Sequence, residues 1–578
     1  MGRILKYVSK YKWKLFVGTF AMILIIGVDL TVPLLQKIFI DEGLAKKDMS
    51  VINGVLLLLL GITVVKAVFG YLKEFIYDLI GIDVHEDLKN DLFKHIQKME
   101  FKYFDKSNTG ELMARIGEDV ENVWETIAYG LRLFVENIFY FTISATALLI
   151  QDWRLALACL SVMIPIGIIG VKLEKNFDEC YGEISDKVAE INTTAQENIA
   201  GVRLVKAFAR ENHEKNKFLK INTEYYGLNM KQTKVIAKYF PPMEFLTNIA
   251  LLIMIVFGGF LVMDGYMTMG TLVAFSGYIW NVIWPLRNLG WLTQLLSRNS
   301  ASAKKIFKIL DTQATIANNK ESYEEKEVSG AITFKNVNFK YNDELVLKNI
   351  NLDIPSNSTV AIMGTTGSGK STLLNLIGRY YEVTDGELLI DGINIKEFDL
   401  KALRENMAIV PQDTFLFSDS ILNNIKFSNK EATLNEVIES AKLACCYDFI
   451  DKLDDKFDTE IGERGLGLSG GQKQRISIAR ALIRKSSIVM LDDSTSALDM
   501  ETEQQLLKNI NSIDKKNTKF IIAHRISAVK NSDLIIYLKN GEIVEQGTHD
   551  ELLEVKGEYY KVYCEQFKDF KELEKEVI

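Results

Sequence analysis

Eight consecutive residues, GTTGSGKS at 364–371, have the composition of a phosphate-binding loop. Glycines let backbone N–H groups wrap around phosphates, a lysine supplies a cation, and a serine hydroxyl can coordinate Mg²⁺. An apolar segment precedes the loop and the helical sequence LLNLIGRYY follows it, which is the strand, loop and helix setting that the motif requires. The residues predicted to bind nucleotide here are Gly364, Thr366, Gly367, Ser368, Gly369, Lys370, Ser371 and Thr372.

Two further segments carry phosphate chemistry. Ile488–Leu491 is an apolar strand that ends in Asp492, and a carboxylate at that end of a parallel strand can hold Mg²⁺ directly or through water. The sequence LSGGQ at 468–472 precedes a helical segment, and a serine with two glycines at a helix start forms a second phosphate cradle. Because this cradle lies far along the chain from the first, it is free to serve a second nucleotide.

The elements that must position these residues divide the 578-residue chain into a membrane half and a soluble half. A bilayer core requires about 20 apolar helical residues. Short links at 41–53, 151–154 and 265–268 alternate with long polar stretches at 81–127 and 174–243. Six segments are apolar enough to be predicted as membrane spans: 15–38, 54–80, 128–150, 155–173, 245–264 and 269–290.

The N-terminal segment predicts the orientation of these spans. Five basic residues precede the first span, so the positive-inside rule places the N-terminus, and with six spans the soluble half, in the cytoplasm. The run from Leu15 to Ile40 is longer than the apolar region of a signal peptide, which predicts a retained membrane helix. The long polar stretches have helical periodicity, so we expect membrane helices to continue into the cytoplasm as two prongs.

The composition argues against some partners and chemistries. The formal net charge is -8, and no Lys/Arg tract with interleaved aromatic residues suggests a nucleic-acid surface, so no nucleic-acid partner is expected. The cysteines have neither metal-ligand spacing nor a disulfide framework, which predicts reduced structural thiols. They are Cys159, Cys180, Cys445, Cys446 and Cys564.

Charged residues inside the predicted spans require an explanation, because each costs roughly 2.5 to 3.5 kcal/mol at the bilayer centre. They either line a polar cavity, or lie near the interfaces, or pair with one another, as Arg132 and Glu136 could at a spacing of four residues. The residues concerned are Asp29, Lys66, Arg132, Glu136 and Arg287.

The phosphate loop, LSGGQ, the strand ending in Asp492 and a later histidine, in this order, resemble the nucleotide-binding domain of ABC ATPases. With the six-span half in front, nearly the whole chain resembles the exporter branch of that family. The resemblance implies an all-α six-helix membrane domain with long cytoplasmic helical extensions, and an α/β P-loop NTPase domain with antiparallel β and helical subdomains. The implied boundaries are 1–315 for the membrane domain, 316–330 for a linker and 331–578 for the nucleotide-binding domain with a C-terminal helical tail.

The resemblance also implies roles for single residues, with ATP and Mg²⁺ as the bound species. Tyr341 in VNFKY would stack on adenine, and Gln412 in VPQDTFLF would link Mg²⁺ to the membrane domain. His524 in IIAHR matches the switch histidine, and Ser496–Asp499 matches the D-loop. Mg²⁺ would be held by Ser371, Gln412 and Asp492, and the γ-phosphate on a partner's P-loop would be contacted by the LSGGQ residues Ser469, Gly470, Gly471 and Gln472.

Coupling between the halves is implied in the same way. In the family pattern the prong tips correspond to Ala114–Asp119 and Phe208–Asn212, which are expected to be coupling helices. The sequence TEIGERG at 459–465 resembles the loop that touches the prongs. Closure of two ATPase domains over two nucleotides would convert an inward-facing cavity into an outward-facing one.

One residue departs from the family pattern. The glutamate that usually follows the Mg²⁺ aspartate and positions the attacking water is replaced by Asp493, which is one methylene shorter. Since a misplacement of about 1 Å can lower a rate on the order of a hundredfold, slow hydrolysis is expected at this chain's own site. We therefore expect a heterodimer with a second ABC half-transporter that retains the glutamate.

The expected function is export of amphipathic or hydrophobic small molecules across the lipid bilayer, with the chain as a multi-pass protein of a bacterial plasma membrane. The alternatives are a homodimeric lipid or peptide exporter and a non-transporting ATP-gated channel or regulator. An importer subunit is disfavoured, because importers usually carry their membrane and ATPase domains on separate chains. The sequence does not identify the substrate.

Overall fold

The computed structural model describes residues 2–318, 323, 328–462, 465, 467–512 and 517–576. The chain forms two compact units, one made of Met1–Lys98 with Ser107–Gln313, the other of Met99–Lys106 with Ala314–Ile578. The predicted linker at 316–330 is described only in part. The segment Met99–Lys106, predicted as part of the membrane domain, belongs instead to the second unit.

The described residues of the first unit are mainly helical, and five helical stretches among them are long and apolar enough to cross a membrane. These stretches contain the first four predicted spans and all but the last residue of the fifth, 245–264, while the sixth, 269–290, lies in α11. In chain order the helices are α1 (Gly2–Val8), η1 (Ser9–Tyr11), α2 (Lys12–Ile38), η2 (Phe39–Leu44), α3 (Met49–Ile96), α4 (Phe101–Lys106), α5 (Thr109–Ala114), η3 (Arg115–Asp119), α6 (Val120–Glu125), η4 (Thr126–Leu131), α7 (Arg132–Gln151), α8 (Trp153–Ala200), α9 (Val202–Ala207), α10 (Glu211–Met263) and α11 (Met269–Asp311), of which α4 falls in the second unit.

Side-chain caps begin three of the long helices within the predicted short links. Asp48 accepts a hydrogen bond from the Ser50 N–H at the start of α3, at 2.8 Å. Asp152 caps α8 and Thr268 caps α11 in the same way. Because such a residue satisfies backbone N–H groups that have no partner within the helix, the chain can turn and re-enter the apolar phase within a few residues.

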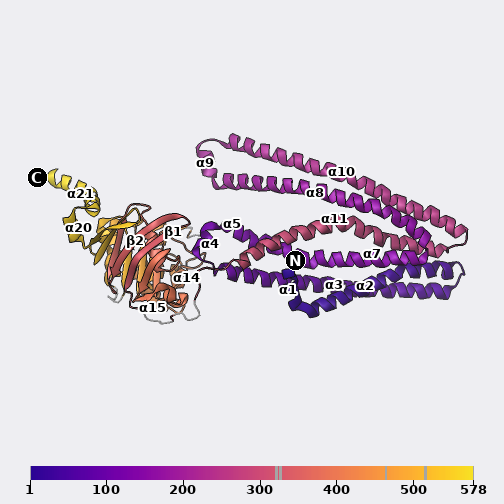
Figure 1. Ribbon diagram of the computed structural model, residues 1–578, viewed down its shortest axis with the longest axis horizontal. Coiled ribbons are helices and arrows are strands. Elements are labelled where there is room, and N and C mark those ends of the chain that lie inside the picture. The colour runs from indigo at the N-terminus through magenta and orange to yellow at the C-terminus, as the bar shows by residue number, and fades with distance from the viewer. Residues whose placement is uncertain are drawn as a thin grey trace. The chain divides into compact units, whose positions relative to one another are not determined.

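Two prongs extend from the apolar helices, and Figure 1 shows α8 and α10 side by side with α9 at their turn. The second prong turns between Ala200 and Glu211, next to the predicted tip at Phe208–Asn212.

The prediction of Ala114–Asp119 as the tip of the first prong is wrong, because the chain reverses between Ile96 and Thr109. Residues 114–119 lie on the returning helix, where Arg115 pairs with Glu111 at 2.7 Å and with Asp119 at 2.6 Å, each one turn away. Such pairs support a continuous helix rather than a turn.

The charged residues predicted inside the spans are paired within the first unit. Asp29 pairs with Lys66 and also accepts a hydrogen bond from Tyr140 at 3.1 Å. Arg287 pairs with Glu244 at 2.6 Å.

Two of these charges take partners on another helix rather than on their own. Arg132 pairs with Glu74, and Glu136 pairs with Lys73 at 3.0 Å, so the suggested Arg132–Glu136 pair is not formed. Both partners lie on α3, where the side chain of Lys73 is buried. The pairs therefore link α7 to α3, and they lower the cost of placing charge in an apolar environment.

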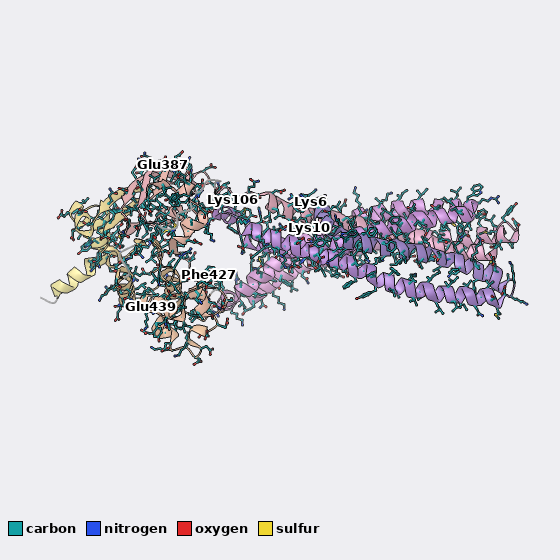
Figure 2. The ribbon with its side chains drawn as sticks, turned by 90° about the horizontal axis from the view of Figure 1, so that it is seen from below. Lys6, Lys10, Lys106, Glu387, Phe427 and Glu439 are labelled. Carbon is teal, nitrogen blue, oxygen red and sulfur yellow. The ribbon has the colours of Figure 1, made fainter. Side chains whose placement is uncertain are left out.

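The basic N-terminal segment lies along α3. Lys10, labelled with Lys6 in Figure 2, pairs with Asp87 at 2.9 Å. One turn to either side, Lys14 pairs with Asp83 and Tyr7 donates to Asp91. Acidic residues four positions apart face one side of a helix, so α3 presents a continuous row of acceptors to this segment.

The second unit contains two sheets. One is antiparallel, with strand order β2-β1-β4-β5, and the other has the order β10-β9-β3-β8-β7-β6, in which only β10 is antiparallel. The strands are β1 (Ile332–Tyr341), β2 (Glu344–Ile354), β3 (Thr359–Gly364), β4 (Asp385–Ile390), β5 (Ile393–Asn394), β6 (Met407–Val410), β7 (Ile488–Asp492), β8 (Thr518–Ile522), β9 (Leu534–Lys539) and β10 (Glu542–Gly547). One apolar core lies between the two sheets and a second lies between the larger sheet and the helices.

The helices of the second unit surround and extend these sheets. They are α12 (Lys370–Ile377), η5 (Ile395–Glu397), α13 (Leu400–Glu405), α14 (Ile421–Lys426), α15 (Leu434–Leu443), α16 (Tyr447–Ile450), η6 (Lys456–Asp458), α17 (Gly470–Leu482), α18 (Met500–Ser512), α19 (Ile526–Val529), α20 (His549–Val555) and α21 (Glu558–Glu576). The α/β domain with an antiparallel sheet and a helical portion agrees with the predicted fold class.

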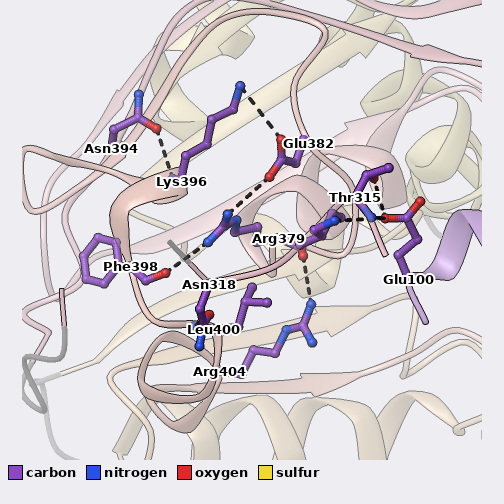
Figure 3. A network of polar contacts seen from close by, with 11 residues as sticks. Glu100, Thr315, Asn318, Arg379, Glu382, Asn394, Lys396, Phe398, Leu400 and Arg404 are labelled. Carbon is purple, nitrogen blue, oxygen red and sulfur yellow. Dashed lines mark hydrogen bonds and ion pairs between the residues drawn. The ribbon is translucent and has the colours of Figure 1, made fainter. Parts of the chain in front are cut away.

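A buried arginine fastens the end of α12 to the segment before β6 (Figure 3). The Arg379 guanidinium donates to the Phe398 carbonyl at 3.0 Å and pairs with Glu382 at 3.2 Å. Arg404, on α13, in turn donates to the Arg379 carbonyl at 2.8 Å. Since the phosphate loop precedes α12 and Gln412 follows β6, this network holds two parts of the predicted site to one another.

We expect Arg379→Ala to lower the free energy of unfolding of the second unit by about 2 kcal/mol, because the buried Phe398 carbonyl loses its donor. The backbone φ of 47° at this position adds strain for alanine. Limited proteolysis of the full-length protein over a temperature series measures the effect. Lys401→Ala is the control, since that side chain is 84% exposed and its partner Glu405 is 3.8 Å away. An equal loss in both variants would contradict the assignment.

Candidate nucleotide site

Four adjacent strand ends at one edge of the larger sheet hold the residues predicted to act on ATP. The strands β3, β8, β7 and β6 are neighbours and run parallel. The phosphate loop follows β3, His524 follows β8, Asp492 ends β7 and Gln412 follows β6. Carboxyl ends of parallel strands meet at one edge, so residues up to 160 positions apart in sequence come together there.

The phosphate loop requires glycine at two positions. A Cβ on Gly364 would lie 2.1 Å from the Leu538 carbonyl oxygen, and one on Gly369 would lie 2.6 Å from Leu347. Both residues also have positive φ, at 145° and 101°. Gly367 also has a positive φ, at 80°, but a Cβ there would meet no neighbouring atom, which leaves room for a ligand over the loop.

Two polar side chains of this loop are suited to phosphate. The Lys370 ammonium is buried and donates to the Gly364 and Thr365 carbonyls at 3.0 and 2.9 Å, so it lies within the loop. Burial lowers the pKa of Lys370, while Asp493 and Asp492 oppose this shift. The buried Ser368 hydroxyl has no hydrogen-bond partner among the described residues. A buried hydroxyl of this kind fits an anionic oxygen as acceptor.

The residues predicted to hold Mg²⁺ are partly assembled. The Ser371 hydroxyl donates to the Asp492 carboxylate at 2.9 Å, which places a hydroxyl and a carboxylate oxygen together at the end of the loop. Burial raises the pKa of Asp492, Asp493 raises it further, and Ser371 and Lys370 oppose the shift. When bound, Mg²⁺ would supply a positive charge beside the phosphates, and the buried Asp492 carboxylate suits it as a ligand. Gln412, the third predicted ligand, is exposed at the same edge.

The predicted catalytic groups are accessible at this edge. Asp493 is partly buried with a φ of 44°, and its backbone is fixed by hydrogen bonds to the Ile522 carbonyl at 3.1 Å and from the Ser496 hydroxyl at 3.0 Å. The His524 side chain is exposed. Because β7 and β8 pair directly, the carboxylate and the imidazole belong to adjacent strands, as a site for positioning water and γ-phosphate requires.

The LSGGQ residues begin α17. Ser469 and Gln472 form a reciprocal capping box, in which Gln472 Oε1 accepts from the Ser469 N–H at 2.9 Å. The Gln474 side chain accepts from the Ala497 N–H at 3.2 Å, and a Cβ on Gly471 would lie 3.0 Å from the Ala497 carbonyl. The D-loop therefore packs closely against this helix start, while Ser469 and Gly470 remain exposed.

An aromatic cluster surrounds Tyr341, the predicted adenine residue. Its ring makes edge contacts with Phe339 and Tyr381, with centroids 4.7 and 5.1 Å apart. The Tyr381 hydroxyl donates to Asp105 of α4 at 2.7 Å, and burial followed by this bond raises the pKa of Tyr381. Phe101, also of α4, packs 4.7 Å from Tyr380. Helix α4 thus packs against this aromatic cluster within the second unit.

The segment before α4 is also bound to the chain that enters the ATPase domain. Glu100 accepts hydrogen bonds from the Thr315 and Ile316 N–H groups at 2.9 and 3.1 Å, as Figure 3 shows for Thr315. Sequence reasoning missed these contacts, since nothing local marks Asp105 or Glu100 as partners of residues more than 200 positions away. The predicted contact loop at 459–465 lies partly outside the described residues, because 463 and 464 are not among them.

A second missed group joins the histidine loop to the D-loop. The buried Glu503 carboxylate accepts from the Thr495 hydroxyl at 2.6 Å and from Arg525 at 2.9 Å. Arg525 also donates to the Leu498 carbonyl at 3.4 Å. The only local signal for this group is position, because Arg525 directly follows His524, and Glu503, on α18, lies four positions beyond Asp499.

Fold and site together define a P-loop ATPase domain fused to a membrane-spanning helical domain. The chain belongs to the ABC transporter family: the family of the ABC transporter transmembrane region matches residues 15–286, and the family described as ABC transporter matches residues 347–496. It is thus a half-transporter, with one membrane region and one ATP-binding domain that couples ATP hydrolysis to transport.

Relatives align along almost the whole chain. The uncharacterized ABC transporter ATP-binding protein YknU of Bacillus subtilis is 35% identical over 98% of this chain and 96% of its own length. An ATP-dependent lipid A-core flippase of Syntrophus aciditrophicus is 34% identical over 98% and 95%. YgaD of Bacillus subtilis, provisionally named a multidrug export ATP-binding/permease protein, is 33% identical over 98% and 99%. The structure of a bacterial Atm1-family ABC exporter with ATP bound superposes with a TM-score of 0.82 at 27% identity, covering 96% of this chain and 99% of that one.

We expect Lys370→Ala to weaken ATP binding by at least about tenfold, because a buried cation is lost from a loop that must hold several negative charges. Titration of the purified protein with a fluorescent ATP analogue measures this. Lys430→Ala, which removes an exposed lysine from the same domain, should leave affinity unchanged. Unchanged affinity in the Lys370 variant would contradict the assignment of the loop.

Proposed function

We propose that the chain is one subunit of a dimeric ABC exporter that moves amphipathic or hydrophobic compounds across the membrane by alternating access. The observation that carries this proposal is the contact of α4 with the nucleotide site, through the bond between Tyr381 and Asp105. This helix continues the chain from membrane helix α3, so movement of the adenine-binding aromatic cluster acts directly on a membrane helix. The lipid flippase and the provisionally named multidrug exporters among the relatives support transport of apolar compounds.

Dimerisation is supported by surfaces that a single chain leaves uncovered. The start of α17 exposes Ser469 and Gly470, the proposed contacts for γ-phosphate on a partner's P-loop. At the tip of the second prong Leu204 is 64% exposed and Phe208 is 70% exposed. We propose that this apolar tip docks on the ATPase domain of the partner, which agrees with its role as a coupling segment.

In the composite site built on this chain's P-loop, Lys370 and Ser368 would hold the phosphates, Ser371, Asp492 and Gln412 would hold Mg²⁺, and Tyr341 would stack on adenine. Asp493 orients the attacking water and His524 contacts the γ-phosphate. We further propose that both termini are cytoplasmic in a bacterial plasma membrane, in line with the basic residues before α2.

The transport assignment predicts that Gln412→Ala lowers transport on the order of tenfold while leaving ATP affinity largely intact, since Gln412 is exposed beyond β6 and acts in coupling. Inverted vesicles containing the purified transporter, assayed for ATP-dependent uptake of an amphipathic dye, measure transport. Asp413→Ala, an exposed neighbour, is the matched control. Equal loss of binding and transport would make Gln412 a nucleotide ligand rather than a coupling residue. Ion conductance without dye uptake would instead indicate a channel.

The shortened carboxylate supports a heterodimer with asymmetric sites. Each site takes a P-loop and strand aspartate from one chain and LSGGQ from the other. This chain has a complete LSGGQ beside Asp493, so it can complete a fast site on a partner that retains glutamate, while its own site turns over slowly. In a homodimer both sites would carry Asp493 and would hydrolyse ATP slowly, so the aspartate would have no role of the kind that an asymmetric pair of sites gives it.

In the heterodimer, Asp493→Asn should change ATP turnover by less than about twofold, whereas removal of the partner's glutamate should lower it on the order of a hundredfold. Asparagine keeps the shape and tolerates the positive φ at this position, so the variant tests the charge alone. Steady-state ATPase rates, measured for the chain alone and with candidate half-transporter partners, distinguish the heterodimer from the homodimer. If the chain alone hydrolyses ATP rapidly, and if Asp493→Asn abolishes this activity, the chain works as a homodimer. The alternative of a homodimeric lipid or peptide exporter would then apply.

A further inference from the structure

The C-terminal helix α21 is fixed to the ATPase domain at its start. The Glu545 carboxylate of β10 accepts a hydrogen bond from the Tyr559 N–H at 3.0 Å and also binds the Glu558 N–H. Tyr559 is fully buried, and its hydroxyl lies 2.6 Å from His549 Nδ1. The helix therefore has a defined position and rotation from its first turn.

One face of α21 packs on the core beside the histidine loop. Tyr559, Val562 and Tyr563 contact the apolar cluster that contains Ile526 of α19. Residues at spacings of three, four and seven lie on one face of a helix, so Gln566 lies on this face, one turn beyond Tyr563.

Gln566 makes two hydrogen bonds to the backbone around His524. Its Oε1 accepts from the Ile526 N–H at 2.8 Å, and its Nε2 donates to the His524 carbonyl at 2.6 Å. The residue that precedes α19, Arg525, makes no side-chain cap to that helix. Gln566 thus supplies a partner for one of the N–H groups that a helix start leaves unsatisfied.

The histidine loop is consequently held from two sides. Arg525 joins it to Glu503 and the D-loop, while Gln566 joins it to the C-terminal helix. The His524 side chain between them is exposed, so no packing of its own fixes its direction. Its orientation at the strand edge therefore depends on its backbone, and that backbone depends on these two attachments.

We propose that Gln566 is a positioning residue for ATP hydrolysis, which sets the backbone of His524 so that the imidazole meets the γ-phosphate. The proposal rests on the proposed role of His524 as the switch histidine. It extends the hydrolytic machinery to the C-terminal helix, which lies outside the matched family region at 347–496. Because both hydrogen bonds that Gln566 makes within the described part of the chain are to backbone atoms, its loss should affect turnover rather than ATP affinity.

The test compares Gln566→Leu with wild type in the full-length transporter, in the dimer that hydrolyses ATP. In a heterodimer the partner's glutamate is removed in every variant, so that the turnover measured is that of this chain's own site. Leucine fills a similar volume but makes neither hydrogen bond. We expect kcat to fall on the order of tenfold with KM for ATP unchanged, as a small misplacement of a catalytic group would produce. Gln566→Glu keeps the acceptor for the Ile526 N–H but loses the donor to the His524 carbonyl, so its kcat should lie between those of wild type and Gln566→Leu. Glu565→Leu, an exposed neighbour on the same helix, should match wild type.

A double-mutant cycle distinguishes positioning from general destabilisation. If Gln566 acts through His524, then Gln566→Leu should have no further effect in the His524→Ala background. A similar loss of turnover in both backgrounds would show that α21 merely stabilises the domain, and would overturn the proposal. The proposal would also be overturned if Gln566→Leu hydrolysed ATP at the wild-type rate while His524→Ala lowered that rate. If His524→Ala itself leaves turnover unchanged, the proposed role of His524 fails, and the positioning role fails with it.

Discussion

The parallel pairing of β3, β8, β7 and β6 is the constraint on which the nucleotide site depends. In the register of this sheet Ile362 pairs with Ile522, Asp492 also pairs with Ile522, and Val410 pairs with Leu491. The four strands therefore end at nearly the same level, and the residues that follow them project from one edge. A shift of a single residue in this register would turn Asp492 to the opposite face of the sheet. The relative positions of the functional side chains at this edge are therefore set by backbone hydrogen bonds along the strands, at a distance from the predicted phosphate position.

Motifs with local causes could be predicted from sequence, whereas contacts that depend on topology could not. The phosphate loop and the capped start of α17 are strand, loop and helix arrangements encoded within about ten residues, so their sequences were sufficient. The partners of Arg132 and Glu136 could not be predicted in this way. The two residues could pair with each other at i,i+4 on α7 or with charged residues of α3, and only the packing of the two helices decides between these arrangements. The turn of the first prong was misplaced because the stretch 81–127 has helical periodicity on both sides of it.

The two ends of the nucleotide site connect to different parts of the chain. At the predicted adenine end, the ring of Tyr341 contacts Tyr381, which donates a hydrogen bond to Asp105 of α4. At the phosphate end, the loop around His524 is joined to the D-loop and to α21. Binding of the base and hydrolysis of the γ-phosphate would therefore act on separate networks. This separation suits a transporter in which occupancy closes the dimer and hydrolysis reopens it.

Asp493 shows how the rigidity of this edge limits what a shorter side chain can do. Its N–H is bonded to the Ile522 carbonyl of β8, and its own carbonyl accepts the Ser496 hydroxyl. With both backbone groups occupied and φ at 44°, the backbone cannot advance toward the phosphates without breaking the pairing that also holds Asp492. A local shift of the backbone therefore cannot restore the reach that Asp493 lacks because its side chain is one methylene shorter. In the proposed dimer, reach would have to come instead from the water or from the residues on the other side of the γ-phosphate, and the LSGGQ helix that would complete this site belongs to the partner subunit. The rate at this chain's own P-loop would then be set as much by how closely the partner closes as by the aspartate itself.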